Sequence, residues 1–302
     1  MVSAEALAVG AALCLGGGTV IMKHGLRTGS RDLFVFVSLA VQAVLFSTLA
    51  VATGLTFGGK WLAVAAFVAS GLIGSILARY LSTLAVDLVG VALAYPVRST
   101  APLFSAVVAV LVLDERVTAL LALGTVVVVG GVAILSYEAY SDGGGDANTT
   151  GRTLGTRGQL LSLTPALLSA ALFGLTPTLR KFGLEAGVSV TDGLALTFTS
   201  AFLVFGSYFL VTSADELRSR RALREARWFV LTGLLWSIAT GAYFTALNLA
   251  DTVVVVPLFY TSPLFAIGLS WLFLRDLEVV DAGVVAGAAC VTVGSAIVVV
   301  FG

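Results

Sequence analysis

The sequence has 302 residues, of which 58% are apolar and 11% charged, a composition that argues against a water-soluble globular domain. Its 17 basic and 17 acidic residues cancel, so no net charge favours a nucleic-acid partner. Two cysteines and one histidine, all in or beside apolar runs, support neither a disulfide framework nor a metal site, and we expect no metal or other cofactor.

Apolar runs long enough to cross a bilayer occur ten times along the chain. A spanning helix needs about 20 apolar residues. Backbone groups in hydrocarbon must be satisfied within the segment, and the absence of alternating apolar and polar residues argues against a β-barrel. The pattern therefore predicts an all-α polytopic membrane protein. The expected spans are 4–22, 33–53, 61–85, 88–113, 117–136, 160–180, 192–213, 228–248, 252–274 and 281–301.

A polar segment divides these runs into two sets of five. Residues 137–159 are rich in Gly, Ser, Thr and Asp and lack apolar periodicity, which is typical of a flexible linker. We therefore expect a first repeat at 1–136, a linker at 137–159 and a second repeat at 160–302.

The two halves resemble each other in sequence. GGGTVIMKHGLRTG in the first run aligns with GLTPTLRKFGLEAG in the sixth, which places Gly16 opposite Gly174 and Lys23 opposite Lys181. PVRSTAPLF in the fourth run aligns with PLFYTSPLF in the ninth, and glycines of the fifth and tenth runs also match. Because each repeat has an odd number of spans, the second repeat would insert upside down. Inverted repeats are typical of secondary transporters, whose substrate site lies between the repeats.

Prolines inside the apolar runs indicate where helices bend. A membrane proline frees a backbone carbonyl, which is tolerated next to protein or a water-filled cavity. Equivalent prolines in the fourth and ninth runs therefore point to the substrate site, although prolines that only shape helix packing would give the same pattern. The candidate kink and gating residues are Pro96, Pro102, Pro177, Pro257 and Pro263.

Two arginines, Arg79 and Arg98, fall deep inside predicted spans. Burying an arginine in hydrocarbon costs at least ~2.5 kcal/mol, so such residues usually face the protein interior or water. Their distances from a turn near Asp87 predict similar depths, and no acidic residue lies deep in a predicted span. A carboxylate or phosphate substrate would match the two planar guanidinium groups. Alternatively, both arginines bind Asp87 or backbone carbonyls and only stabilise the fold.

Other polar and aromatic residues in the spans complete the candidate site. Tyr95, Arg98, Ser99 and Pro102 recur at helical spacing along the fourth run. Tyrosine and tryptophan also populate membrane interfaces for reasons unrelated to a substrate. The candidate substrate-binding residues are Arg79, Tyr80, Tyr95, Arg98, Ser99, Trp236, Tyr243, Asn248, Tyr260 and Thr261.

Two short charged loops occupy equivalent positions in the halves. Residues 114–116 read Asp-Glu-Arg, and residues 275–278 read Arg-Asp-Leu-Glu. We expect a local ion network in each loop that fixes the hairpin.

These residues together resemble the EamA-like family of the drug/metabolite transporter superfamily. The resemblance rests on the pattern Gly-x-x-x-x-x-x-Lys that begins at Gly16 and Gly174, on the stretch 92–135, and on its echo at 255–298. It implies ten helices around a central cavity, with the third, fourth, eighth and ninth spans among its walls. It also implies transport without ATP or a metal, and termini in the cytoplasm, whereas the loop charges, with Arg180 and Lys181 counted among them, favour termini outside.

We therefore expect a secondary active transporter that moves a small, anionic or amino-acid-like metabolite across the cell membrane by alternating access. The expected partners are this substrate, membrane lipid, and a coupling proton or counter-substrate. A membrane enzyme would need clustered His, Cys or acidic residues, which the sequence lacks. A flippase of lipid or lipid-linked sugar is the alternative, because paired arginines would also suit a head-group phosphate.

Overall fold

The computed structural model describes residues 3–26, 30–55, 59–89, 97–141, 163–218, 220–273 and 282–301, and in these residues it is helical without a strand. The first half contains α1 (Ala4–Leu26), α2 (Arg31–Thr53), α3 (Trp61–Ser70), the π-helix η1 (Gly71–Ala78), α4 (Arg79–Val89), α6 (Ala101–Leu113) and α7 (Ala119–Ser141). The second half contains α9 (Thr164–Glu185), α10 (Val190–Thr212), the 3-10 helix η2 (Ala214–Arg218), α11 (Arg220–Leu249), α12 (Thr252–Phe259), α13 (Ser262–Phe273) and α14 (Ala282–Phe301).

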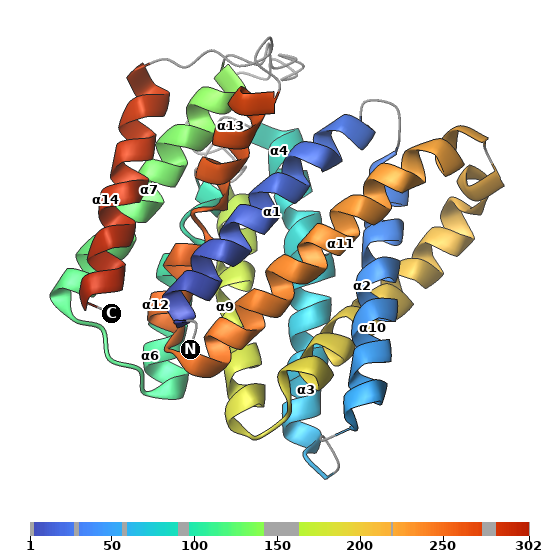
Figure 1. Ribbon diagram of the computed structural model, residues 1–302, viewed down its shortest axis with the longest axis horizontal. Helices are drawn as coiled ribbons and strands as arrows, with labels where there is room; N and C mark the ends of the chain where they lie inside the picture. The colour runs from blue at the N-terminus through green and yellow to red at the C-terminus, as the bar shows by residue number, and fades with distance from the viewer. Residues whose placement is uncertain are drawn as a thin grey trace.

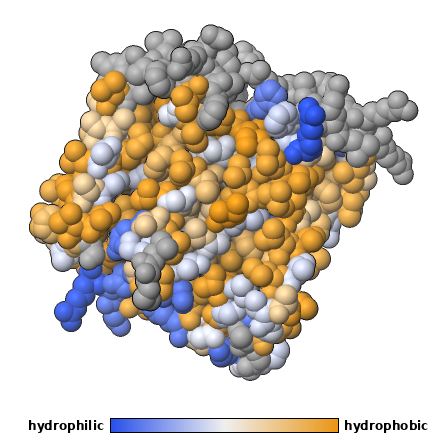
Figure 2. Space-filling view, in the orientation of Figure 1, coloured by the Kyte–Doolittle hydropathy of each residue, from blue (hydrophilic) through white to orange (hydrophobic). Residues whose placement is uncertain are grey.

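The helices present apolar side chains to the outside of the molecule. Six helical stretches are long and apolar enough to cross a membrane, and three shorter apolar helices accompany them in the described part of the chain. Many large apolar side chains on their outer faces are exposed. Figure 2 shows hydrophobic residues over most of the visible face, with hydrophilic residues gathered toward its edges. Lipid is the solvent that such a surface requires.

Side-chain caps begin α2 and α10. The Ser30 hydroxyl accepts a hydrogen bond from the Leu33 amide at 3.1 Å, and the Ser189 hydroxyl accepts one from the Asp192 amide at 3.1 Å. The Ser30 hydroxyl also donates to the carboxylate of Glu216, which ties the start of α2 to η2. These caps satisfy amide groups that a helix leaves unpaired in its first turn.

The two halves run in opposite directions and interlock. In Figure 1, α1 runs away from the side where both ends of the chain lie, whereas α9 runs toward that side. α1 packs against α11 and α13 of the second half, and α9 packs against α3, α4 and α6 of the first. α2 packs against α10, and α7 packs against α14. Each half therefore buries much of its helical surface against the other.

Matched glycines allow the closest of these contacts. A Cβ atom on Gly16 of α1 would lie 2.8 Å from the Ser262 carbonyl oxygen of α13. A Cβ atom on Gly174 of α9 would lie 2.8 Å from the Ala101 carbonyl oxygen of α6. Both approaches are too short for any other residue. The glycines that align in the sequence thus make the same contact in the structure, each with the opposite half.

Three predicted spans differ from the structure in continuity, and one of them, the span 88–113, contains a turn at Ser99 and Thr100. The span 61–85 is interrupted by the π-helix η1, and helical structure then continues to residue 89. The span 252–274, predicted as one helix, is two helices, α12 and α13. At the end of the first half, α7 continues to Ser141, into the segment predicted as a linker.

Candidate functional site

A turn at Tyr260 and Thr261 separates α12 from α13 (Figure 1). Thr261 donates its hydroxyl and its amide to the carbonyl of Leu258, at 2.6 and 3.2 Å respectively. Pro263 then lies at the second position of α13, where a helix needs no intrahelical N–H donor. The threonine therefore ends one half-helix, and the proline begins the next.

The first half contains the same break. Thr100 lies in a turn before α6 and donates its hydroxyl and its amide to the carbonyl of Val97, at 2.7 and 3.1 Å. Pro102 follows at the second position of α6. The span 88–113, predicted as one helix, is therefore interrupted here. Broken helices at equivalent positions of two repeats are characteristic of transporter substrate sites.

Two arginines lie together beside the first break. Arg98 precedes the turn by one residue, and its guanidinium lies over the Phe173 ring of α9 at 4.9 Å. Arg79, the first residue of α4, lies near enough to Arg98 for the two positive charges to repel. The structure thus brings together the two arginines that the sequence singled out.

A third arginine, Arg180 of α9, joins this region although the sequence analysis counted it as a loop charge. Its guanidinium lies 4.9 Å from the centre of the Phe244 ring and 6.0 Å from that of Tyr243, both on α11. α9 continues to Glu185, so Arg180 belongs to the helix. The aligned motifs place an apolar residue, Met22, opposite Arg180. This match could have indicated that Arg180 occupies a position inside a helix.

Aromatic side chains from α11 and α12 surround Arg180 and the second break. The Tyr243 ring is buried and stacks on the Phe259 ring at 4.2 Å. Tyr260 lies in the turn itself and interacts electrostatically with both Arg98 and Arg180. Tyr260 is therefore close to one cation from each half.

Pro177 explains the local form of α9 next to Arg98. A proline cannot donate to the carbonyl four residues earlier, here that of Phe173. The Thr176 hydroxyl donates to this carbonyl instead, at 2.9 Å. The backbone polarity that Pro177 frees is therefore satisfied within α9, beside the ring that Arg98 covers. Pro257 likewise lies inside α12, where it is buried.

The remaining candidates lie in different environments. The Trp236 indole donates to the Leu15 carbonyl at 3.3 Å and thereby joins α11 to α1, which is a packing contact. Tyr80, at 65% exposure, and Asn248 lie on the outside of their helices. Ser99 and Thr261 are buried at the two breaks. Tyr95 and Pro96 fall outside the described residues.

The π-helix η1 lies directly before Arg79. Its wider turn changes the hydrogen-bond pattern of the backbone, and the Ser169 hydroxyl of α9 donates to the Ala78 carbonyl at 2.9 Å. A Cβ atom on Gly71 would lie 2.2 Å from the Thr197 carbonyl oxygen of α10. π-Helical backbone is rare and frequently occurs at functional sites, and η1 ends directly before Arg79.

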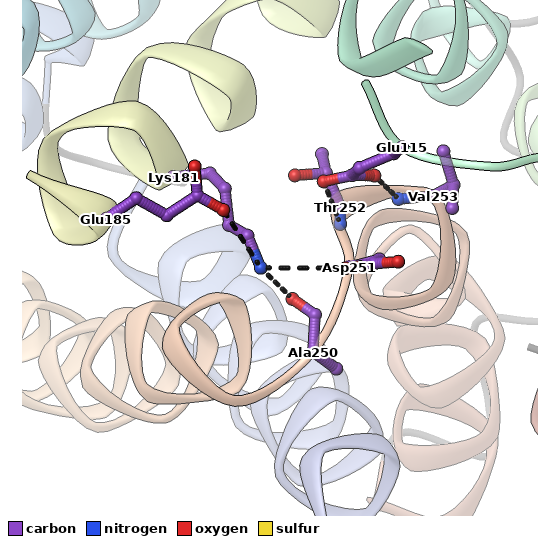
Figure 3. Close-up of polar contacts among 7 residues, drawn as sticks. All are labelled: Glu115, Lys181, Glu185, Ala250, Asp251, Thr252 and Val253. Atoms are coloured by element: carbon purple, nitrogen blue, oxygen red, sulfur yellow. Dashed lines mark hydrogen bonds and ion pairs between the residues drawn. The ribbon is translucent and has the colours of Figure 1, made fainter. Parts of the chain in front are cut away.

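A second polar cluster joins the halves on the side where the chain termini lie. Figure 3 shows the Glu115 carboxylate, from the loop between α6 and α7, at the start of α12. One carboxylate oxygen accepts the Thr252 amide at 2.8 Å, and the other accepts the Val253 amide at 3.0 Å. Glu115 is buried. A charge in this position satisfies the first amide groups of a helix and complements its dipole.

Lys181 belongs to the same cluster (Figure 3). Its ammonium donates to the Ala250 carbonyl at 2.7 Å, and it lies 3.9 Å from the Asp251 carboxylate and 3.8 Å from that of Glu185. The sequence analysis counted Lys181 as a loop charge, but the residue lies within α9 and is buried. It therefore fixes the turn between α11 and α12.

The expected ion network in the loop at 114–116 is therefore wrong for Glu115, whose partners are backbone amides of the other half. The equivalent loop at 275–278 falls outside the described residues. No group of three or more His, Cys, Asp or Glu residues could hold a metal ion in the part of the chain that the structure describes.

A family model described as the EamA-like transporter family matches residues 2–137 and again residues 160–300. The chain belongs to the EamA-like transporter family. As a member of this family with several membrane-spanning helices, it is an integral, multi-pass membrane protein. The match describes transporters and gives no support to the lipid flippase alternative.

A solved crystal structure of a protein has the same fold as this EamA-like chain. The two are 14% identical, the alignment covers 100% of each chain, and the TM-score is 0.77. A search of curated proteins finds no match to the chain. The relationship to the solved structure therefore concerns the fold alone.

Proposed function

We propose that the protein is a secondary active transporter that carries a small metabolite across the cell membrane. The matched breaks at Thr100 and Thr261 carry this proposal. Each break interrupts a membrane helix and frees backbone polar groups, which are tolerated in a membrane only beside protein or a water-filled cavity. A substrate bound between the breaks would contact both repeats at once.

Alternating access gives the cluster in Figure 3 a specific role. Glu115 joins the two halves on one side of the molecule, and Lys181 fixes the turn that precedes its partner helix α12. A transporter must open this side during part of its cycle and close it during another. In the proposed mechanism, the contacts of Glu115 with α12 form when this side is closed and separate when it opens.

The chemistry beside the breaks favours a substrate with a carboxylate or phosphate group. Arg98 lies at the first break, close enough to Arg79 for the two positive charges to interact. A guanidinium group binds a planar carboxylate or a phosphate through two parallel hydrogen bonds. An amino acid would offer such a carboxylate, as would a simple organic acid. A coupling proton or a counter-substrate would supply the driving force.

Counterflow uptake in proteoliposomes tests the proposal. The panel contains anionic, zwitterionic and cationic metabolites, and wild type is compared with Arg98→Gln. We expect wild type to accumulate solutes that carry a carboxylate or phosphate, and we expect Arg98→Gln to lose this uptake because the neutral amide cannot replace a charged, bidentate contact.

Arg227→Gln is the matched control. Arg227 also lies over an aromatic ring, that of Trp228 at 5.0 Å, but it is exposed near the start of α11. Its substitution removes the same charge and should leave uptake unchanged. Wild type that transports no member of the panel would contradict the proposed function. Uptake that survives Arg98→Gln would assign Arg98 to the stability of the fold.

A further inference from the structure

Arg180 has an unusual set of neighbours for a cation inside a membrane protein. The rings of Phe244 and Tyr243 lie beside its guanidinium. Its Nε atom is buried and has no hydrogen-bond partner in the described part of the chain. Buried polar atoms are nearly always paired, so an unpaired one on a charged group calls for a ligand, an ion or water.

The acidic residues near Arg180 form ion pairs with the adjacent Lys181 instead. Lys181 takes the carboxylates of Glu185 and Asp251 and the Ala250 carbonyl. Among the ion pairs formed between described residues, none involves Arg180. Aromatic rings stabilise the faces of a guanidinium by cation-π attraction, but they leave its N–H groups without acceptors.

Arg180 and Arg98 come from different repeats and lie along the same face of α9. Arg98 covers the Phe173 ring, and Arg180 follows Phe173 by about two helical turns. Arg98 belongs to the first half and Arg180 to the second, and Tyr260 at the second break lies near both. The ring of Phe173 positions Arg98, and the rings of α11 position Arg180. Both guanidinium groups are therefore held by packing before any ligand arrives, which lowers the entropy that binding must overcome.

We propose that Arg98 and Arg180 together bind the two negative charges of one dianionic substrate. This inference rests on the proposed transport function and specifies its substrate class. Each guanidinium can bind one carboxylate or share a phosphate, so a small dicarboxylate and a phosphate monoester both satisfy the geometry. A substrate that contacts both repeats would stabilise the closed arrangement of the halves only when both of its charges are present.

Competition in proteoliposomes tests this substrate class. Succinate is compared with monomethyl succinate, which has nearly the same size and one charge fewer, and glycerol phosphate and inorganic phosphate separate phosphate recognition from dicarboxylate recognition. In wild type we expect the half-saturating concentration of the preferred dianion to be lower by about tenfold or more than that of its monoanionic analogue, since a charge-assisted pair contributes at least this much.

The variant Arg180→Gln should remove that preference. We expect its half-saturating concentration for the dianion to rise about tenfold or more, while that for the monoanion stays nearly constant, because only one charge loses its partner. Arg180→Lys keeps the charge and should restore part of the preference. Arg227→Gln, measured in parallel, should leave both values unchanged. Size-exclusion profiles in detergent verify that each variant is folded.

Each outcome separates the inference from the proposed function. If wild type transports monoanions or zwitterions as well as dianions, or if Arg180→Gln weakens both analogues equally, the dianion site is wrong and transport still stands. If folded wild type transports no solute of the panel, both proposals fail. Loss of dianion selectivity in Arg180→Gln, with monoanion uptake retained, is the result that supports the site.

Discussion

Arg180 and Lys181 are adjacent cations on α9, but their side chains have different neighbours. Successive residues of an α-helix point about 100° apart around its axis. Arg180 therefore meets aromatic rings of α11, whereas Lys181 meets the turn that joins α11 to α12. In the sequence both residues look like loop cations, since the predicted apolar run 160–180 ends at Arg180. Only the packing of α9 against α11 distinguishes a cation that fixes the fold from one that faces a substrate.

Replacing Lys181 by methionine tests the structural role of that residue. Lys181→Met keeps much of the volume but leaves the Ala250 carbonyl without its donor and Asp251 without its cation. We expect the free energy of unfolding to fall by about 1–3 kcal/mol, measured by chemical unfolding in detergent. Glu185→Gln is the control, because an exposed ion pair contributes less than about 1 kcal/mol. A Lys181→Met protein as stable as wild type would refute this role.

At the scale of helices, the apolar runs predict positions well and interruptions poorly. α2 and α10 begin within two residues of the predicted spans 33–53 and 192–213. In both helices the polar capping residue lies close to the start of the apolar run. The break at Tyr260 and Thr261 is invisible in hydropathy, since apolar residues continue on both sides. The prolines marked its neighbourhood, but the threonine hydrogen bond that ends α12 depends on the folded backbone.

The start of α12 gives a prediction for Glu115. Glu115→Gln replaces a charge that accepts two amides by an amide that has one acceptor oxygen and would turn an N–H donor toward a helix amide. We expect a loss of about 1–3 kcal/mol in the free energy of unfolding, with a lower thermal midpoint in detergent.

The neighbouring Asp114→Asn is its control, because Asp114 is exposed and adopts a positive φ of 53°, which asparagine accepts readily. Equal destabilisation by both changes would mean that loss of charge from the loop, and not the cap on α12, sets the effect.

For the whole molecule, the aligned halves predicted an inverted repeat but not the interlocking contacts between the halves. The pairing of Gly16 with Gly174 is readable in sequence, yet the partner of each lies in the opposite half, against α13 and α6 respectively. Arg79 and Arg98 were predictable as site candidates because charges in apolar runs are rare. Phe173 and Phe244 were not, since an aromatic residue that faces a cation looks the same in sequence as one that faces lipid.

The symmetric glycine contacts lead to a paired prediction. Gly16→Ala and Gly174→Ala each introduce a Cβ atom 2.8 Å from a backbone atom of the other half. Overpacking of this kind costs about 1–3 kcal/mol, so both variants should unfold at lower temperature and transport more slowly.

Gly241→Ala in α11 should be neutral or stabilising, because no atom lies within 4 Å of its added Cβ and alanine favours helix. If only one of the paired variants were affected, the two contacts would not be equivalent.

The interlock also has a consequence for how the protein is made. A ribosome releases the amino-terminal half first, so α1 enters the membrane while the helices that cover it, α11 and α13, are still unsynthesised. Gly16 and Gly18 pack against α13 and the Trp236 ring in the folded protein, so they lack these partners during that interval. α1 is thus inserted well before its main partners, and its small-residue face lacks α11 and α13 until most of the second half has followed.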